Sequence, residues 1–174
     1  MRRAPRIAFG QYLLRPWDDA DIDFAMRAAR DPDIKRYSSV GEAATQQLVQ
    51  AWIESRTSST RFDWVVEEST VPVGRVSLAH VDLDDGVAEV GYWVLAPHRR
   101  RGVASAALGA IETYAFESLE LFRLFIRHEV ENEPSCALAT SRGYLAEGTQ
   151  RGAFERAGSR RDLHVHALLV NDAR

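Results

Sequence analysis

The sequence predicts a single domain of the α/β class, and three observations support this prediction. Its 174 residues are 45% hydrophobic and 27% charged, a composition typical of an ordinary globular domain. Segments with strand periodicity and segments with helix periodicity are mixed along the chain. No internal repeat and no long linker divides it. We therefore expect residues 1–174 to form one layered domain of about seven strands and about four helices, with residues 1–10 as a tail that could be disordered.

A strand and two helices are expected first. "YLLRPW" predicts a strand that ends at its proline. Asp18 or Asp19 is expected near the cap of the first helix, and "RDPD" is expected to end it. The second helix is "TQQLVQAWIESR", in which Leu48 is predicted to share an apolar face with Trp52 and Ile53.

The rest of the chain alternates between strands and helices. "RFDWVVEES", "VPVGRVSLAHVDL" and "GVAEVGYWVLAP" predict strands, with a hairpin turn at "DLDDG". "GVASAALGAIETYAFESL" predicts a helix and "LFRLFIRHEV" a strand. Another helix is expected from near Pro134 to Gly143, where proline and glycine suit its two ends. "YLAEGTQRGAFERAG" and "RRDLHVHALLV" predict a final hairpin, whose edge strand could support a homodimer.

Charge, cysteine content and hydropathy exclude several classes of protein. The net charge of −3 and the isoelectric point near 6.0 argue against direct nucleic-acid binding. Cys136 is the single cysteine, which excludes an internal disulfide and a cysteine-rich zinc site and is compatible with a reducing compartment. No apolar run approaches the ~20 residues that cross a bilayer, and no signal-peptide pattern follows "MRRAPRIAFG". A cytoplasmic protein without membrane contact is expected.

The stretch "RRRGVASAAL" places three arginines directly before a predicted helix. A helix N-terminus carries unpaired N–H groups and partial positive charge, so acidic residues are favoured there. Here no acid follows Arg99 until Glu112. Gly102 and Ala104 leave the backbone N–H groups accessible, and Ser105 adds a hydroxyl donor. The pattern indicates an anion site, although a solvated basic loop is the alternative. Neither GxGxxG nor a Walker loop is present.

Three segments, "EVGYWV", "RRRGVASAAL" and "NEPSCALATSRGY", together resemble the GCN5-related N-acetyltransferase (GNAT) superfamily. Within it they resemble the branch that acetylates ribosomal-protein N-termini and small amines, as does the opening "YLLRPWDDAD". The likeness extends from Gln11 to the final strand. It implies a mixed, mostly antiparallel sheet, and acetyl-CoA as co-substrate without a metal.

The resemblance also implies where acetyl-CoA binds. The loop and helix start from Arg99 to Ser105 would hold its pyrophosphate through backbone N–H groups, while "WVLA" would pair with the pantetheine arm. The implied cofactor-binding residues are Val94, Leu95, Ala96, Arg99, Arg100, Arg101, Gly102, Val103, Ala104, Ser105, Asn132 and Ser135. The family usually has glycine where this chain has Arg100, so a side chain stands where the backbone approaches phosphate. The three arginine side chains could face the phosphate on the adenosine ribose, or solvent.

Acetyl transfer from the thioester to a primary amine requires an oxyanion donor, an acid for the thiolate and a base for the amine. A backbone N–H near Leu95 or Ala96 is the expected oxyanion donor, if its strand diverges from its neighbour as in the family. Ser135 is the expected acid. Glu89 is the candidate base through a water, and its alternative role is an exposed strand acid paired with a cation.

Two further chemistries have candidate residues. His164 and His166 share one face of a predicted strand and could bind a metal together with His128, but ordinary strand histidines are the favoured interpretation and no metal is expected. Cys136 could be a nucleophile, although a buried helix cysteine is favoured.

Two other functions remain open beside the enzyme. The domain could bind acyl-CoA without catalysis, as a sensor or interaction module, or use its arginines to contact RNA or a ribosomal surface. For the enzyme, the acceptor could be a protein N-terminus or a small amine.

Overall fold

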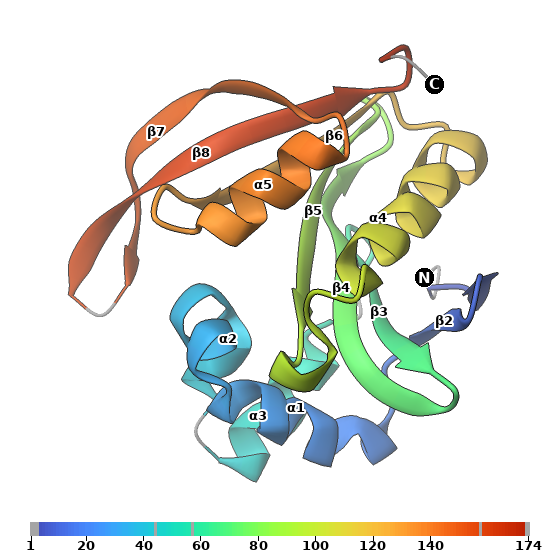
Figure 1. The fold of residues 1–174 in the computed structure, drawn as a ribbon, viewed down its shortest axis with the longest axis vertical. Coiled ribbons are helices and arrows are strands. Elements are labelled where there is room, and N and C mark those ends of the chain that lie inside the picture. The colour runs from blue at the N-terminus through green and yellow to red at the C-terminus, as the bar shows by residue number, and fades with distance from the viewer. Residues whose placement is uncertain (1–3, 44, 57, 157, 173–174) are drawn as a thin grey trace.

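The computed structural model describes residues 4–43, 45–56, 58–156 and 158–172. Within these ranges the chain forms one eight-stranded sheet with helices on both faces (Figure 1). The sheet order is β1-β2-β3-β4-β5-β6-β8-β7. The strands are β1 Ile7–Phe9, β2 Tyr12–Pro16, β3 Phe62–Glu68, β4 Val71–Asp82, β5 Val87–Val94, β6 Arg123–Glu129, β7 Leu145–Arg156 and β8 Ser159–Leu169. The α-helices are α1 Ile22–Arg30, α2 Pro32–Tyr37, α3 Gln46–Glu54, α4 Val103–Thr113 and α5 Glu133–Ser141.

The mixed, mostly antiparallel sheet predicted from the sequence is confirmed, with one strand and one α-helix more than expected. The additional strand is β1, which pairs antiparallel with β2 inside the segment expected as a tail. Residues 1–3 of that segment lie outside the described residues.

The additional helix is α2, and it begins within the "RDPD" that ends α1. The side chain of Asp31 accepts hydrogen bonds from the backbone N–H groups of Asp33 and Ile34, and Pro32 occupies the first turn. An aspartate cap followed by proline is a typical helix start. The same tetrapeptide therefore ends one helix and begins the next.

Two other helices differ from the prediction in detail. In α3 the buried face contains Val49 with Trp52 and Ile53, whereas Leu48 is 50% exposed. The predicted apolar face was therefore wrong at Leu48. The helix expected over residues 102–119 is α-helical only as far as Thr113 and continues as a π-helical turn, Tyr114–Ser118.

Each face of the sheet has its own buried cluster. Helices α4 and α5 cover one face, where Trp64, Leu108 and Tyr144 belong to the larger cluster. Helices α1, α2 and α3 cover the other face, where Phe24 and Trp93 are buried. No helix in the described part of the chain is long and apolar enough to span a membrane. Strand β7 lies at one edge of the sheet, and its use in a homodimer stays a prediction.

The one parallel pair in the sheet order, β5 with β6, is short. Its register runs from Val87 opposite Arg123 to Glu89 opposite Phe125. Beyond these residues β5 continues to Val94 and β6 to Glu129 without further pairing to each other. We call this the β5–β6 divergence. It is the divergence on which the predicted oxyanion donor depended, and it frees the facing backbone edge of β5.

Candidate active site

The backbone of β5 presents polar groups to the β5–β6 divergence. The Leu95 N–H donates to the Val73 carbonyl on β4, at 3.0 Å. In an antiparallel ladder the hydrogen-bonded pairs alternate with pairs whose N–H and C=O groups point to the other side. Because Val94 lies opposite Gly74 and Tyr92 opposite Val76, the N–H groups of Tyr92 and Val94 point toward the divergence.

This geometry corrects the predicted oxyanion donors. The Leu95 N–H is used in the sheet, and the Ala96 N–H donates to a carboxylate oxygen of Asp31 at 3.2 Å. Neither group faces the divergence unpaired. The N–H of Val94, one residue earlier, has the required direction.

The start of α4 has the features expected of an anion site. Gly102 caps the helix with φ +78°, in the left-handed region that favours glycine, and no side chain caps the first turn. The first turn also contains no acidic residue. Because the first intrahelical bond runs from the Ala106 N–H to the Gly102 carbonyl, the N–H groups from Gly102 to Ser105 precede that ladder. Their combined polarity suits a phosphate or pyrophosphate group.

A hydrogen bond crosses the molecule from β5 to α5 at the divergence. The Tyr92 hydroxyl lies 2.7 Å from the Ser135 Oγ and 3.4 Å from the Ser135 carbonyl oxygen. Burial raises the pKa of Tyr92 to about 12, an effect only partly opposed by the hydrogen bond to Ser135. Tyr92 therefore keeps its proton at neutral pH. Tyr92 lies within the segment "EVGYWV", but its contact with Ser135 depends on the fold, and the local sequence pattern does not indicate it.

Asn132 lies immediately before α5 and acts as its cap. Its side-chain oxygen accepts from the Ser135 N–H at 3.3 Å. This cap fixes the first turn of α5, and with it the position of Ser135, which is 9% exposed.

Comparison with known proteins decides the family. The chain matches the Acetyltransferase (GNAT) domain over residues 11–144. The chain belongs to the GNAT acetyltransferase family. It is thus an acetyl-CoA-dependent N-acetyltransferase, which confirms the resemblance found in its sequence.

Individual GNAT proteins are similar over different lengths. The N-acetyltransferase p20 of Bacillus licheniformis is 27% identical over 165 residues, covering 91% of this chain and 93% of that protein. The ribosomal-protein-serine acetyltransferase of Escherichia coli (strain K12) is 28% identical over 99 residues, covering 57% of this chain and 55% of that protein. The structure of the ribosomal L7/L12 alpha-N-protein acetyltransferase RimL, in complex with coenzyme A, has the same fold, with a TM-score of 0.88 at 16% identity and coverage of 97% of this chain and 100% of that chain.

Within this GNAT domain, the three consecutive arginines have different environments. Arg99 donates to Asp31 at 2.6 Å, to Asp33 at 2.5 Å and to the Val94 carbonyl at 2.9 Å. Its guanidinium thus joins the loop to α2, and a contact from this side chain to a cofactor phosphate stays a prediction. The sequence could not show the bonds to Asp31 and Asp33, because these partners are 66 and 68 residues away.

Arg101 and Arg100 complete the basic loop. Arg101 pairs with Glu68 at 3.0 Å, at the end of β3. Arg100 is exposed and has no hydrogen-bond or ion-pair partner within the described ranges. Its backbone has φ +59°, so this arginine adopts the left-handed conformation that a glycine would adopt without strain.

Asp31 is the acidic residue that connects α2 to the loop before α4 in this GNAT domain. Burial alone raises the pKa of its carboxyl group. Hydrogen bonds from Arg99 and from the backbone N–H of Ile34 outweigh burial, so the pKa of Asp31 lies below its ordinary value. Asp31 therefore stays ionised while it holds α2 and the loop before α4 together.

Glu89 occupies the opposite face of the sheet from Ser135. Val90 and Tyr92 pack on the α4 and α5 face, so alternation places Glu89 and Trp93 on the face of α1, α2 and α3. The Glu89 carboxylate accepts hydrogen bonds from Arg127 at 2.7 and 3.0 Å. The structure thus pairs Glu89 with a cation, which is the alternative role predicted for Glu89 from the sequence. It does not bring Glu89 and Ser135 together on one face.

Proposed function

We propose that this protein transfers the acetyl group of acetyl-CoA to a primary amine by direct attack in a ternary complex. The observation that carries the proposal is the β5–β6 divergence, with free N–H groups on β5 and the Tyr92–Ser135 contact beside it. A thioester placed along β5 would meet a hydrogen-bond donor and a proton donor at one point.

The transfer uses the groups of this site in order. The amine nitrogen attacks the acetyl carbonyl carbon, and the Val94 N–H donates to the oxyanion that forms. The carbon–sulfur bond then breaks, and the departing thiolate takes the proton of the Ser135 hydroxyl. Tyr92 holds that hydroxyl in place and can return a proton to it, because its own pKa keeps it protonated.

The proposed base is Glu89, acting through a water on the face opposite Ser135. Attack on the thioester from that face would leave the amine proton on the side of Glu89 and the leaving thiolate on the side of Ser135. The ion pair with Arg127 keeps the Glu89 carboxylate oriented.

The cofactor would bind along β5 and at the start of α4. The N–H groups from Gly102 to Ser105 would hold the pyrophosphate, and the free edge of β5 near Val94 would pair with the pantetheine arm. The side-chain oxygen of Asn132 is used by the cap of α5, so a contact to pantetheine would come from its amide nitrogen. The unpaired Arg100 would contribute its backbone N–H.

For the acceptor, a protein N-terminus is our first candidate. The support is the partial similarity to the Escherichia coli protein named as a ribosomal-protein-serine acetyltransferase. A small amine is the second candidate, since the described residues contain no motif that selects between them.

The test is a thiol-release assay with acetyl-CoA against a panel of N-terminal peptides and small amines. We expect release that depends on the amine, with double-reciprocal lines that converge as a ternary complex requires. Parallel lines would indicate a covalent acetyl-enzyme and contradict direct attack. Tight acetyl-CoA binding without release for any amine would support the non-catalytic binding module instead.

A further inference from the structure

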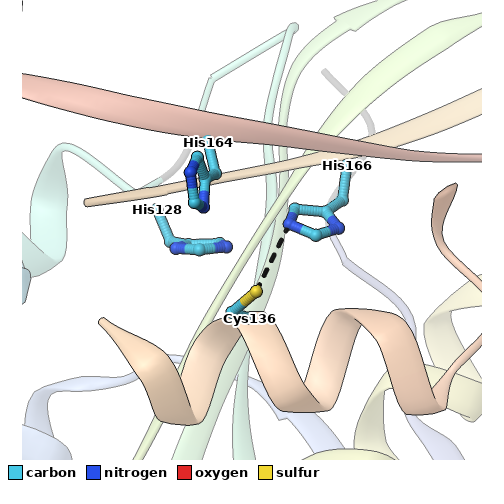
Figure 2. Close-up of side chains that lie close together, drawn as sticks. All are labelled: His128, Cys136, His164 and His166. Atoms are coloured by element: carbon cyan, nitrogen blue, oxygen red, sulfur yellow. Dashed lines mark hydrogen bonds between the residues drawn. The ribbon is translucent and has the colours of Figure 1, made fainter. Parts of the chain in front are cut away.

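Four side chains that the acetyl transfer does not use meet beneath α5. They are three of the five histidines in the chain and its single cysteine: His128 on β6, His164 and His166 on β8, and Cys136 on α5. One nitrogen from each histidine and the cysteine sulfur all lie within 4.8 Å of one another. Figure 2 shows the three rings grouped on the side of the strands that faces Cys136.

The sheet register brings the histidines together. His128 lies directly opposite His164 in the antiparallel β6–β8 pair, and His166 follows two residues later on the same face. The rings of His128 and His166 stack with centroids 5.1 Å apart. Since α5 covers this face, Cys136 reaches the group from the other side, with its sulfur 3.8 Å from the His166 Nε2.

The hydrogen bonding of His128 leaves a free lone pair aimed at this group. The His128 Nδ1 lies 2.8 Å from the Glu129 backbone carbonyl, which can only accept, so Nδ1 carries the proton. Its Nε2 is then an acceptor, and it is buried without a hydrogen-bond partner in the described part of the chain. His128 is 5% exposed. A histidine that donates one N–H to a backbone carbonyl and offers its other nitrogen is the usual form of a metal ligand.

We propose that His128, Cys136, His164 and His166 bind one zinc ion. Three imidazole nitrogens and one thiolate give the four ligands of a closed tetrahedral site, which is typical of structural zinc. In such a tetrahedron the ligand atoms are ~3.3–3.7 Å apart, given zinc bonds of ~2.1 Å to nitrogen and ~2.3 Å to sulfur. The Cys136–His166 distance of 3.8 Å is already near this range, and the widest pair closes by about 1 Å.

Binding would be accompanied by loss of the Cys136 thiol proton to solvent, since zinc binds the thiolate. The ion would join α5 to β6 and β8. Cys136 directly follows Ser135, so zinc would hold the first turn of α5, which carries the proposed acid. The zinc ion takes no part in the transfer step, and zinc binding can be measured without any acetyl acceptor. The failure of one proposal therefore leaves the other standing.

The test uses the full-length protein after treatment with a chelator and its removal. Zinc is titrated in competition with a chromophoric chelator, and cobalt(II) is used in parallel as a spectroscopic probe. We expect one zinc per chain, and for cobalt an intense near-ultraviolet thiolate-to-metal absorption with visible bands of tetrahedral form. Zinc should also raise the thermal unfolding temperature of the wild type.

Two variants and one control assign the site. Cys136→Ser and His164→Ala should each weaken zinc binding by more than about 100-fold, beyond the ~10–100-fold typical of losing an outer-shell partner. His164 is only half-buried, so His164→Ala is expected to fold. His80→Ala removes a histidine whose side chain is 68% exposed and should leave zinc binding unchanged.

Several results would overturn the site. One is zinc binding that saturates well below one ion per chain when zinc is in excess, and another is affinity retained in folded Cys136→Ser or His164→Ala. If both variants failed to fold, the wild-type cobalt spectrum decides: absence of the thiolate absorption excludes Cys136 as a ligand. Loss of binding in His80→Ala would assign the metal to the surface.

Discussion

The Tyr92 hydroxyl and the Ser135 Oγ lie 2.7 Å apart and join β5 to α5 where β5 and β6 diverge. Because Tyr92 is held protonated by burial, the simplest arrangement has Tyr92 donating to Ser135, which leaves the serine proton free for another acceptor. We therefore expect Ser135→Ala to lower kcat by about 100-fold or more, the usual contribution of a positioned acid. The affinity for acetyl-CoA, measured by calorimetry, should change little. An unchanged kcat would remove Ser135 from the mechanism.

Tyr92→Phe tests whether the tyrosine acts through the serine. We expect kcat to fall by roughly 10-fold, with KM for acetyl-CoA nearly unchanged, because only one hydrogen bond is lost. In the Tyr92→Phe, Ser135→Ala double variant the effects should not add, since both single changes break the same contact. Additive effects would show that Tyr92 has a separate, merely structural role.

Variants of Glu89 and Arg127 distinguish whether Glu89 acts as the base or only forms a structural ion pair. If Glu89 accepts the amine proton through water, Glu89→Gln lowers kcat by about 100-fold or more, the usual contribution of a positioned base. Arg127→Gln keeps the carboxylate and should lower kcat much less. We expect this pattern, measured with one amine acceptor at one pH. Equal losses of kcat in both variants would assign Glu89 to the ion pair alone.

The sequence predicted the parts of this domain that depend on local pattern. Strand alternation led to the sheet, and the small residues after Gly102 led to a helix start without an acidic residue in its first turn, since both depend on neighbouring residues. Anion binding at that helix start stays a prediction. The sequence could not predict contacts that the fold brings together from distant segments. Arg99 meets Asp31 only because α2 packs beside the loop before α4, and Tyr92 meets Ser135 only because β5 and β6 diverge. The sequence shows that His164 and His166 share one face of β8. That His128 and Cys136 lie close to them follows only from the sheet register and from the position of α5.

Asp31→Asn should reveal the pH dependence of the stability that Asp31 contributes between α2 and the loop before α4. The pKa of Asp31 is lowered in the folded protein, so its ionised form stabilises the fold above its ordinary value of 3.8, and this contribution is lost as the pH falls through the folded pKa. We expect the variant to be about 1–3 kcal/mol less stable at neutral pH, since Asn keeps the cap but loses the charged bonds. Urea unfolding over a pH series should show the two proteins converging below about pH 4.

Asp33→Asn is the matched control for that prediction. Asp33 also pairs with Arg99, but its side chain is 72% exposed, so its loss should cost less than about 1 kcal/mol. A gap between wild type and Asp31→Asn that stays constant down to acidic pH would contradict the ionic role of Asp31.

Arg100→Gly tests the residue that replaces the glycine usual in the family. Arg100 has φ +59°, a conformation that costs a side chain of order 1–3 kcal/mol and costs glycine little. The greater entropy of glycine in the unfolded chain offsets part of this gain, so we expect a net stabilisation below about 1 kcal/mol. If the backbone N–H makes the contact to pyrophosphate, the affinity for coenzyme A stays within about threefold, under ~0.7 kcal/mol.

Arg100→Val supplies the opposite case, because a β-branched side chain disfavours positive φ strongly. It should lower both the unfolding temperature and the affinity for coenzyme A. Calorimetry with coenzyme A and with 3′-dephospho-coenzyme A separates backbone from side chain. Should Arg100→Gly lose affinity for coenzyme A alone, the guanidinium binds the ribose phosphate, and the backbone contact is not the reason for this arginine. Equal affinity for both ligands in wild type and Arg100→Gly shows that the guanidinium does not contribute to binding. Loss of affinity in Arg100→Val then assigns the contact to the backbone, whose left-handed conformation is the feature that the loop requires.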